Sequence, residues 1–440
     1  MSETQLRTPF PQRAHAALGD AHLQEALTIA TTKFIGLRKE SFAGYPAGEA
    51  LRDRARAIKE ATLQRLDQHL ERLADNIERL GGHVHWAATG DEARDIILRL
   101  CRDRGVRMAV KSKSMATEEI DLNEALEAAG VKPVETDLFS KELGGRFEAD
   151  PEVLTAVARK ELRQKYLEAD MGITGANFAV AETGTIVLVT NEGNGRMVTS
   201  LPRIHVAVMG MEKVIPTMTD LMIFLSILAR SATGQKLSSY TTLVRGPRQP
   251  GEVEGPEELH LILMDNGRMR QVAGTLREAL YCLRCGACLN VCPVYRQIGG
   301  HAYGYTYPGP IGILLTAMLE GTGAVKDLAH ASSLCGACKD VCPVRIDIPR
   351  MLVELREQVD REKIAPWGER MLFGLARRAM ASSALFRLGA RLGRLAQRPF
   401  VRNGRLRGLP LFFGQWTRTR DLPPVAARTF SERWKDLERP

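Results

Sequence analysis

The sequence contains no apolar run long enough to cross a bilayer. Its longest apolar stretch, residues 221–229, falls well short of the roughly 20 residues that a membrane-spanning helix needs. Residues 1–15 carry Arg and Pro without the apolar segment of a signal peptide. We therefore expect neither a transmembrane helix nor a signal peptide.

Two kinds of cofactor signature are also missing. No G-x-G-x-x-G turn stands between a strand and a helix, so the sequence has no NAD or flavin fingerprint. The nine histidines show no spacing typical of metal ligands. Nicotinamide or flavin chemistry is therefore not expected of this chain.

Cysteine is scarce, with eight residues among 440, which is too few for a secreted disulfide scaffold of this length. Seven of the eight nevertheless fall within 61 residues, between Cys282 and Cys342. Such crowding favours metal ligation in a reducing compartment, so we expect a cytoplasmic protein. The eighth, Cys101, follows the apolar rhythm of a helix and is expected in the core.

Positive charge is concentrated at the end of the chain. Of the net charge of +9, residues 366–440 contribute +11, from sixteen Lys and Arg against five Asp and Glu, which leaves −2 for the rest. The tail predicts an amphipathic helix over 371–395 that packs on its own chain or docks on a partner, with peripheral membrane contact as the alternative. Nucleic acid is not the expected partner, because no recognition motif accompanies the charge.

The apolar periodicity predicts several domains, as the length also requires. Leu and Ile at three- and four-residue steps predict a helix over 51–80, and strands then alternate with helices from 83 to 264. That alternation indicates an α/β fold with a largely parallel sheet. We expect four segments: a helical arm (1–69), an α/β domain (70–268), a small α-helical ferredoxin-type domain (269–355) and a helical and irregular Arg-rich tail (356–440).

The crowded cysteines form two motifs. The first has offsets of 3, 6 and 10 and a following proline, as in the bacterial ferredoxin run, whose fourth cysteine ligates the other cluster. The second repeats the last three positions and has Ser332 where a further cysteine would stand. The first motif consists of Cys282, Cys285, Cys288 and Cys292, and the second of Cys335, Cys338 and Cys342.

Exchange of the last cysteine between the motifs predicts two unequal clusters. A [4Fe–4S] cluster receives a full set of four thiolates from Cys282, Cys285, Cys288 and Cys342. The other receives only Cys292, Cys335 and Cys338. This second cluster is either [3Fe–4S] or [4Fe–4S], and its fourth ligand is Ser332, another group or none.

Structural zinc is the competing interpretation of paired thiolates two residues apart. One tetrahedral zinc ion would leave three of the seven cysteines without a role, and two ions would need eight ligands. Neither arrangement explains the offset of 10 followed by proline in both motifs. Iron–sulfur clusters are therefore the preferred prediction.

The chain resembles the lactate utilization protein B family, iron–sulfur subunits of a three-part L-lactate oxidation system. The resemblance covers nearly the whole chain and rests on four segments. These are GITGANFAVAETGTIVLVTNEGNGRM (172–197), CLRCGACLNVCPVYRQIGGHAYG (282–304), YPGPIG (307–312) and SSLCGACKDVCPVRIDIP (332–349). Family members also have three cysteines in the second motif, so Ser332 is typical of them.

The resemblance implies a fold and a role. The α/β domain would be related to ribose-5-phosphate isomerase and CoA-transferase-like folds, and the cluster domain would be similar to the helical ferredoxin of succinate dehydrogenase. The chain would be a non-catalytic electron-transfer subunit whose partners are the other subunits and the electron donor and acceptor proteins. Two alternatives stay open: the α/β domain itself oxidises a small carboxylate, or the clusters are a redox sensor with a nucleic-acid-binding tail.

Polar, glycine-rich turns in the α/β domain are candidates for a ligand site. Asn177, Glu182, Thr183, Asn194 and Arg196 combine hydrogen-bonding groups with a guanidinium suited to a carboxylate or phosphate. The alternative is that they form ordinary tight turns, as Asn-Gly at 194 and 195 would between strands. For the basic turn at 111–114, which could hold an anion, we expect a solvated surface turn instead.

Overall fold

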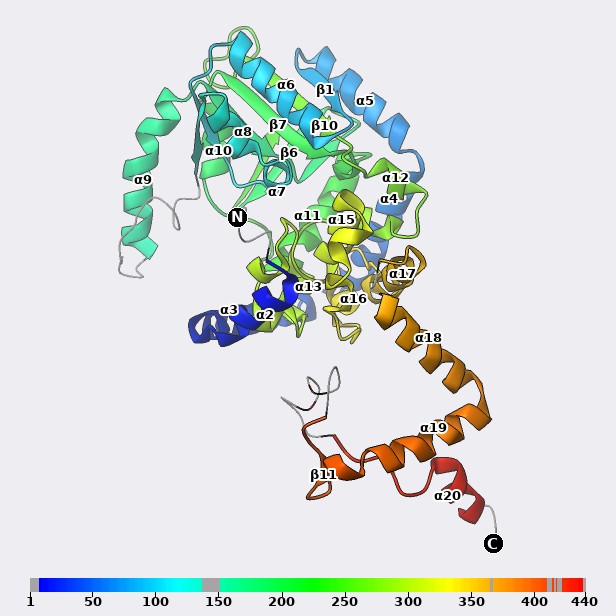
Figure 1. Cartoon of the computed structure of the whole chain (residues 1–440). Helices are drawn as coiled ribbons and strands as arrows, with labels where there is room; N and C mark the ends of the chain where they lie inside the picture. Colours follow the sequence, from blue (N-terminus) through cyan, green and yellow to red (C-terminus); the bar gives the residue numbers. More distant parts are fainter. Residues whose placement is uncertain are drawn as a thin grey trace. The chain divides into compact units, whose positions relative to one another are not determined.

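The computed structural model describes residues 8–136, 151–364 and 367–437, apart from 410–413, 415, 416 and 418–421 (Figure 1). Contacts within the chain divide it into two compact units, Met1–Val359 and Asp360–Pro440. The first unit contains the α/β fold and both cysteine motifs, and the second contains the basic tail.

Helices open the first unit, as predicted. They are α2 (Phe10–Gly19), α3 (Ala21–Ala43), α4 (Gly48–Gln64) and α5 (Leu66–Arg79). The single helix predicted over 51–80 is in fact two, because Arg65 leaves the helical conformation, with φ −131°. Each leucine that α5 buries contributes about 1.5–3 kcal/mol to folding. Its buried apolar stripe consists of Leu66, Leu70, Leu73, Ala74 and Ile77.

Six parallel strands form the first sheet, in the order β1-β10-β7-β4-β2-β3. The strands are β1 (His83–Ala87), β2 (Met108–Lys111), β3 (Lys132–Glu135), β4 (Met171–Gly175), β7 (Ile204–Gly210) and β10 (Glu258–Met264). Because all of them run the same way, their carboxyl ends meet at one edge, where open α/β sheets bind ligands. The predicted parallel α/β fold is confirmed.

The two faces of this sheet are both buried. In β7, Val206 and Val208 pack with the apolar residues of α6 (Gly90–Asp103) and α8 (Leu122–Ala128). Ala207 and Met209 alternate with them and join the larger core on the other face. That larger core continues through the second sheet and into the cysteine motifs.

A second sheet was not anticipated from the sequence. It has the order β8-β5-β6-β9 and contains β5 (Phe178–Val180), β6 (Thr185–Thr190), β8 (Val214–Ile215) and β9 (Tyr240–Val244). Gly184, with φ +71°, makes the tight turn between β5 and β6. These two strands therefore pair antiparallel and cannot extend the parallel sheet.

Other helices connect these strands. They are α7 (Met115–Glu118), α9 (Pro151–Glu168), α10 (Asn194–Ser200), α11 (Met218–Ala232) and α12 (Met269–Val272). The Asn-Gly pair at 194 and 195 does not form the hairpin turn considered for it. Asn194 begins α10, and its side-chain oxygen accepts a hydrogen bond from the Gly195 amide at 2.7 Å.

Short helices carry the cysteine motifs at the end of the first unit. They are η2 (Arg277–Tyr281), α13 (Ala287–Val291), α14 (Tyr295–Ile298), η3 (His301–Tyr303), α15 (Gly309–Glu320), η4 (Thr322–Val325), η5 (Leu328–His330), α16 (Ala337–Val341) and α17 (Ile348–Arg361). α15 is buried along nearly its whole length and contacts both η2 and α13. The cysteine-bearing segment and the α/β fold thus share one apolar core.

The second unit contains α18 (Trp367–Ala381), α19 (Ser383–Ala396), η6 (Arg398–Phe400), the strand pair β11 (Val401–Arg402) and β12 (Arg405–Leu406), and α20 (Phe430–Leu437). The single helix predicted over 371–395 is two helices. Ser382 has extended backbone and caps α19, because its hydroxyl accepts a hydrogen bond from the Leu385 amide at 3.4 Å.

Candidate metal centre

The two cysteine motifs have the same backbone conformation. Two aligned residues are left-handed: Arg284, before Cys285 in the first motif, at φ +59°, and Leu334, before Cys335 in the second, at φ +55°. The glycine after that cysteine is left-handed too, with φ +78° at Gly286 and +86° at Gly336. One helical turn follows, α13 or α16. This repeated path leads each motif into the short helix that carries its next cysteine, Cys288 in α13 and Cys338 in α16.

Four thiols from both motifs line one cavity. Cys282, Cys285 and Cys288 of the first motif meet Cys342 of the second around about 60 Å³, and the remaining lining is mostly apolar. Burial raises the pKa of Cys285 to about 12, and the neighbouring Cys342 and Cys282 add to the rise. Burial likewise raises the pKa of Cys342 to about 11. Metal coordination reverses this preference, because the metal-bound form is the thiolate.

The other three thiols form a second group. Burial raises the pKa of Cys338 to about 12, with further contributions from Cys292 and Cys335. Cys292 itself interacts electrostatically with Cys335 across the two motifs. Cys288 lies within electrostatic reach of both Cys342 and Cys338, so the two groups are neighbours.

Backbone amides donate hydrogen bonds to side-chain atoms of both motifs. Arg284 N donates to Cys282 Sγ at 3.3 Å, and Ile346 N donates to Cys342 Sγ at 3.4 Å. In the second motif Leu334 N donates to Ser332 Oγ at 3.2 Å. Since Leu334 matches Arg284 in position and conformation, the Ser332 hydroxyl has the place that the Cys282 thiol has in the first motif.

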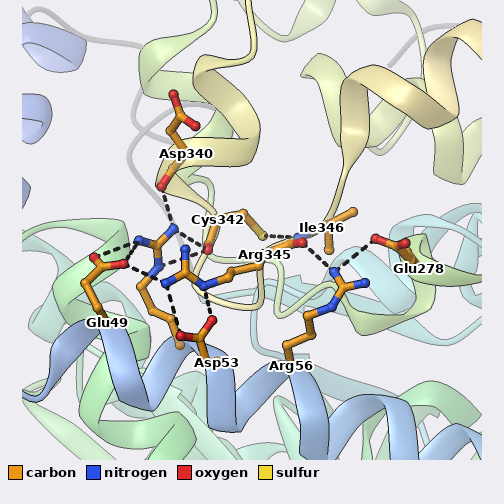
Figure 2. A network of polar contacts seen from close by, with 9 residues as sticks. Glu49, Asp53, Arg56, Glu278, Asp340, Cys342, Arg345 and Ile346 are labelled. Atoms are coloured by element: carbon orange, nitrogen blue, oxygen red, sulfur yellow. Dashed lines mark hydrogen bonds and ion pairs between the residues drawn. The ribbon is translucent and has the colours of Figure 1, made fainter.

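Helix α4 fixes the backbone of the last cysteine through Arg52, whose partners Glu49, Asp340 and Cys342 are labelled in Figure 2. The Arg52 side chain is 3 % exposed and donates to the Cys342 carbonyl, at 2.9 Å from Nη2 and 3.2 Å from Nε. It also donates to the Asp340 carbonyl and pairs with Glu49 at 2.8 Å. A single guanidinium therefore joins the N-terminal helices to the chain on both sides of Val341.

Further ion pairs along α4 hold the residues after Cys342 (Figure 2). Arg345 pairs with Glu49 at 2.8 Å and with Asp53. Arg56 pairs with Glu278 at 3.1 Å and donates to the Arg345 carbonyl. This clasp, formed by Glu49, Arg52, Asp53 and Arg56 of α4, attaches the second motif to the N-terminal helices.

A buried charge network lies on the other side of the first motif. Arg268 Nε pairs with Glu212 at 2.7 Å, and Arg284 Nη2 approaches the same carboxylate at 3.4 Å. Burial would raise the pKa of Glu212, but the surrounding cations outweigh it and lower that pKa to about 2. Lys213 Nζ donates to the Cys282 carbonyl at 3.1 Å, and burial lowers the pKa of Lys213 to about 8. Lys59 donates to the Glu212 carbonyl.

The thiols fit iron–sulfur clusters. Five of the seven are buried, two accept backbone hydrogen bonds, and the four that line the cavity face mostly apolar side chains, as cluster ligands do. Within the described ranges, no three Cys, His, Asp or Glu side chains converge as a single metal ion would require.

The residues proposed for a ligand site are not brought together. Asn177 and Asn194 line a cavity of about 450 Å³ at the carboxyl edge of the first sheet. Glu182 instead accepts a hydrogen bond from the Met218 amide at 3.0 Å, at the start of α11, and Thr183 bonds to the Thr185 hydroxyl. Arg196 lies in α10 and is not among the residues that line this cavity.

In the basic turn at 111–114 only Lys113 is exposed, so the expected solvated turn is wrong for the other three residues. Lys111 is 1 % exposed, bonds to the Thr117 hydroxyl at 3.0 Å and pairs with Glu135 at 3.2 Å. Ser112 and Ser114 are buried and line the 450 Å³ cavity. The prediction was wrong because partners distant in sequence compensate Lys111.

Several residues around this cavity were missed from the sequence. Arg284 and Tyr307 line both the 450 Å³ cavity and the thiol-lined cavity. Three further charged residues, Glu212, Lys213 and Arg268, line the 450 Å³ cavity. A signal was present: charged residues directly after the buried strand β7, and an arginine inside the first cysteine motif. Cys101 lies in the core as predicted, and burial raises its pKa to about 11.

No helix in the described part of the chain is long and apolar enough to cross a membrane.

Two family models match successive parts of the chain: the LUD domain over residues 70–264 and the 4Fe-4S dicluster domain over residues 278–346. The second match covers all seven clustered cysteines.

Relatives match over almost the whole chain. Lactate utilization protein B of Bacillus licheniformis is 39% identical, covering 97% of this chain and 96% of its own. The proteins of that name from Shouchella clausii and Geobacillus thermodenitrificans are 40% and 43% identical, over 97% and 89% of this chain and 96% and 89% of theirs. A solved DUF162 family protein of Deinococcus radiodurans is 17% identical, with a TM-score of 0.30, over 45% of this chain and 98% of its own. The chain belongs to the lactate utilization protein B family.

Proposed function

We propose that the chain is the electron-transfer subunit of a cytoplasmic complex that oxidises L-lactate. The name of its relatives connects the family with lactate utilization. Iron–sulfur clusters carry single electrons and leave substrate chemistry to other groups. The observation that carries the proposal is the grouping of seven thiols, six of them buried or half-buried and one, Cys335, exposed, into adjacent sets of four and three.

The ligand sets follow from this grouping. Cys282, Cys285, Cys288 and Cys342 would hold a [4Fe–4S] cluster. Cys292, Cys335 and Cys338 would hold the second, [4Fe–4S] or [3Fe–4S], with Ser332 Oγ as its fourth ligand in the four-iron form. The hydrogen bond from Leu334 N to Ser332 Oγ supports this role, because it repeats the bond that Cys282 accepts.

Each segment would have its own task. The arm (1–69) would fix the second motif through α4, and the α/β domain (70–268) would cover the first. The cluster domain (269–355) would pass electrons between a donor and an acceptor protein. The tail (356–440) would dock on another subunit, since α18 and α19 expose Trp367, Phe373 and Leu392 beside their arginines.

The direct test is reduction of the clusters by lactate. Anaerobically purified chain should remain oxidised with L-lactate alone and become reduced, by EPR, once the partner subunits are added. Reduction by lactate without partners would contradict the carrier role and favour oxidation within the α/β domain. Replacing Leu385 and Leu392 by Ser should weaken capture of the partner subunits without changing the iron content.

A further inference from the structure

The 450 Å³ cavity has the position and size of a ligand site. One wall follows the carboxyl ends of β2, β4 and β7, the second is residues 188–194, and the third is the cysteine motif itself at Leu283 and Arg284. Ligands bind in open α/β sheets at this edge, and small-molecule sites typically measure about 300–1,000 Å³. The proposed electron-carrier role does not use this space.

Strands β4 and β7 both end in a glycine at the cavity, where polar side chains lie close to the backbone. A side chain at Gly175 would collide with Ser114 Oγ, and one at Gly210 would collide with the Glu212 carboxylate and the Arg268 guanidinium. Glycine therefore lets the strands end directly against the polar groups of the cavity. Its apolar lining includes Leu188 and Met209.

The charge around the cavity has an excess of cations. The charged side chains that line the cavity are four basic ones, Lys113, Lys213, Arg268 and Arg284, and two carboxylates, Glu192 and Glu212. Arg268 pairs with Glu119 at 2.8 Å and with Glu212 at 2.7 Å. Part of this excess would balance the thiolates of the first cluster, and the part that faces the cavity favours an anion there.

Among these cations, Arg284 has a hydrogen-bond donor that the described residues do not use. Its guanidinium lies over the Tyr307 ring at 4.3 Å and contacts Glu212 only through Nη2 at 3.4 Å. Its Nη1 is buried and has no hydrogen-bond partner among the residues that the structure describes. A planar guanidinium of this kind suits the oxygens of a carboxylate or phosphate.

We propose that this cavity binds a small organic anion, whose carboxylate or phosphate group Arg284 holds. The anion would complete the buried charge network, with its organic part against Leu188 and Met209. Because Arg284 also lines the thiol-lined cavity and lies between Cys282 and Cys285, occupancy would be sensed at the first metal centre.

Equilibrium dialysis of the anaerobic, iron-loaded full chain tests this site. The probes are labelled pyruvate, L-lactate and inorganic phosphate, which separate a carboxylate from a phosphate. At least one should bind, and Arg284→Gln should weaken it at least about tenfold, the cost of one charged hydrogen bond. Ala176→Phe, which fills the cavity from a lining residue, should weaken it similarly. Arg99→Gln, an exposed arginine of α6, is the matched control and should bind as the unmodified chain does.

The outcomes separate this inference from the proposed function. Failure of the iron-loaded chain to bind any probe, or undiminished binding by Ala176→Phe, would overturn the anion site and leave the electron-carrier role intact. Iron and sulfide are counted in the same samples, so a defect in the clusters is recognised as such. A shift of the first cluster's EPR signal on probe binding, absent in Ala176→Phe, is the expected second readout.

Discussion

The two cysteine motifs have the same backbone conformation but different surroundings. The first motif lies between the α/β fold and α15, and its Cys282 and Cys288 are buried. In the second, Cys335 is exposed, and Ser332 stands in the position that Cys282 has in the first. The same loop can therefore build a shielded centre with four thiolates and a more open centre with three.

The last cysteine of each motif connects the two centres. Cys342 is held by Arg52 of α4 and lines the cavity of the first motif, whereas Cys292 interacts with Cys335 of the second. Neither centre would then be independent of the other motif. The predictions below test this exchange and the contrast in shielding.

The largest effect is expected from removing the last cysteine of either motif, because each is predicted to ligate the cluster of the other motif. Cys342→Ala should remove the cluster of the first motif and spare the other, and Cys292→Ala should do the reverse. Each should lose about half of the bound iron, measured by anaerobic iron and sulfide analysis with EPR. Cys101→Ala should change neither. Loss of the first motif's own cluster in Cys292→Ala would contradict the exchange.

The next effect concerns the clasp. Arg52→Met should destabilise the chain by about 2–4 kcal/mol, because buried carbonyls at Asp340 and Cys342 lose their donor. Denaturant unfolding gives the stability, and EPR should show the first cluster weakened more than the second. Arg52→Lys should recover only part of the lost stability, since an ammonium cannot reproduce the planar, multiple-donor geometry of the guanidinium. Arg54→Met, exposed on the same helix, should be close to neutral.

The contrast in shielding predicts an order of loss. During slow exposure to air or a chelator, the signal of the second cluster should disappear before that of the first, because Cys335 is exposed and only three thiols are available to this cluster. EPR spectra taken through the exposure follow both centres. Simultaneous loss of both EPR signals would mean that the difference in exposure between the two motifs does not affect the stability of their clusters.

The smallest effect is expected at Ser332. Ser332→Cys should supply a fourth thiolate, remove any [3Fe–4S] signal and lower the potential of the second cluster. Ser332→Ala should increase the [3Fe–4S] signal. Ser333→Cys is the neighbouring control and should leave the spectrum unchanged, whereas an equal response to both cysteine variants would argue against a ligand position at 332.

Local patterns predicted most of the elements but not all of their partners. The apolar runs of β7 and β10 identify buried strands wherever they pair. Nothing in the residues of β5 and β6 says that they leave the parallel sheet, because that follows from the turn at Gly184. Ser382 and Arg65 likewise interrupt helices whose apolar periodicity continues through them.

The candidate site divides in the same way. Cysteine spacing is local and predicted all seven thiols that the structure groups, and their assignment to clusters stays a prediction. The second cavity depends on residues far apart in sequence, so Lys111 resembled a solvated charge and Arg284 resembled a spacer within its motif. Glu182 and Arg196 had suitable chemistry, but only the fold shows that they are not part of the cavity lining.

The most direct test of the account is metal analysis of the anaerobically purified chain, with iron, sulfide and zinc counted together and EPR and Mössbauer spectra recorded. We expect about seven or eight irons per chain, with one cluster fully thiolate-ligated and the other containing a distinct iron or a [3Fe–4S] signal. Stoichiometric zinc without iron and sulfide, or two spectroscopically equivalent four-thiolate clusters, would contradict it.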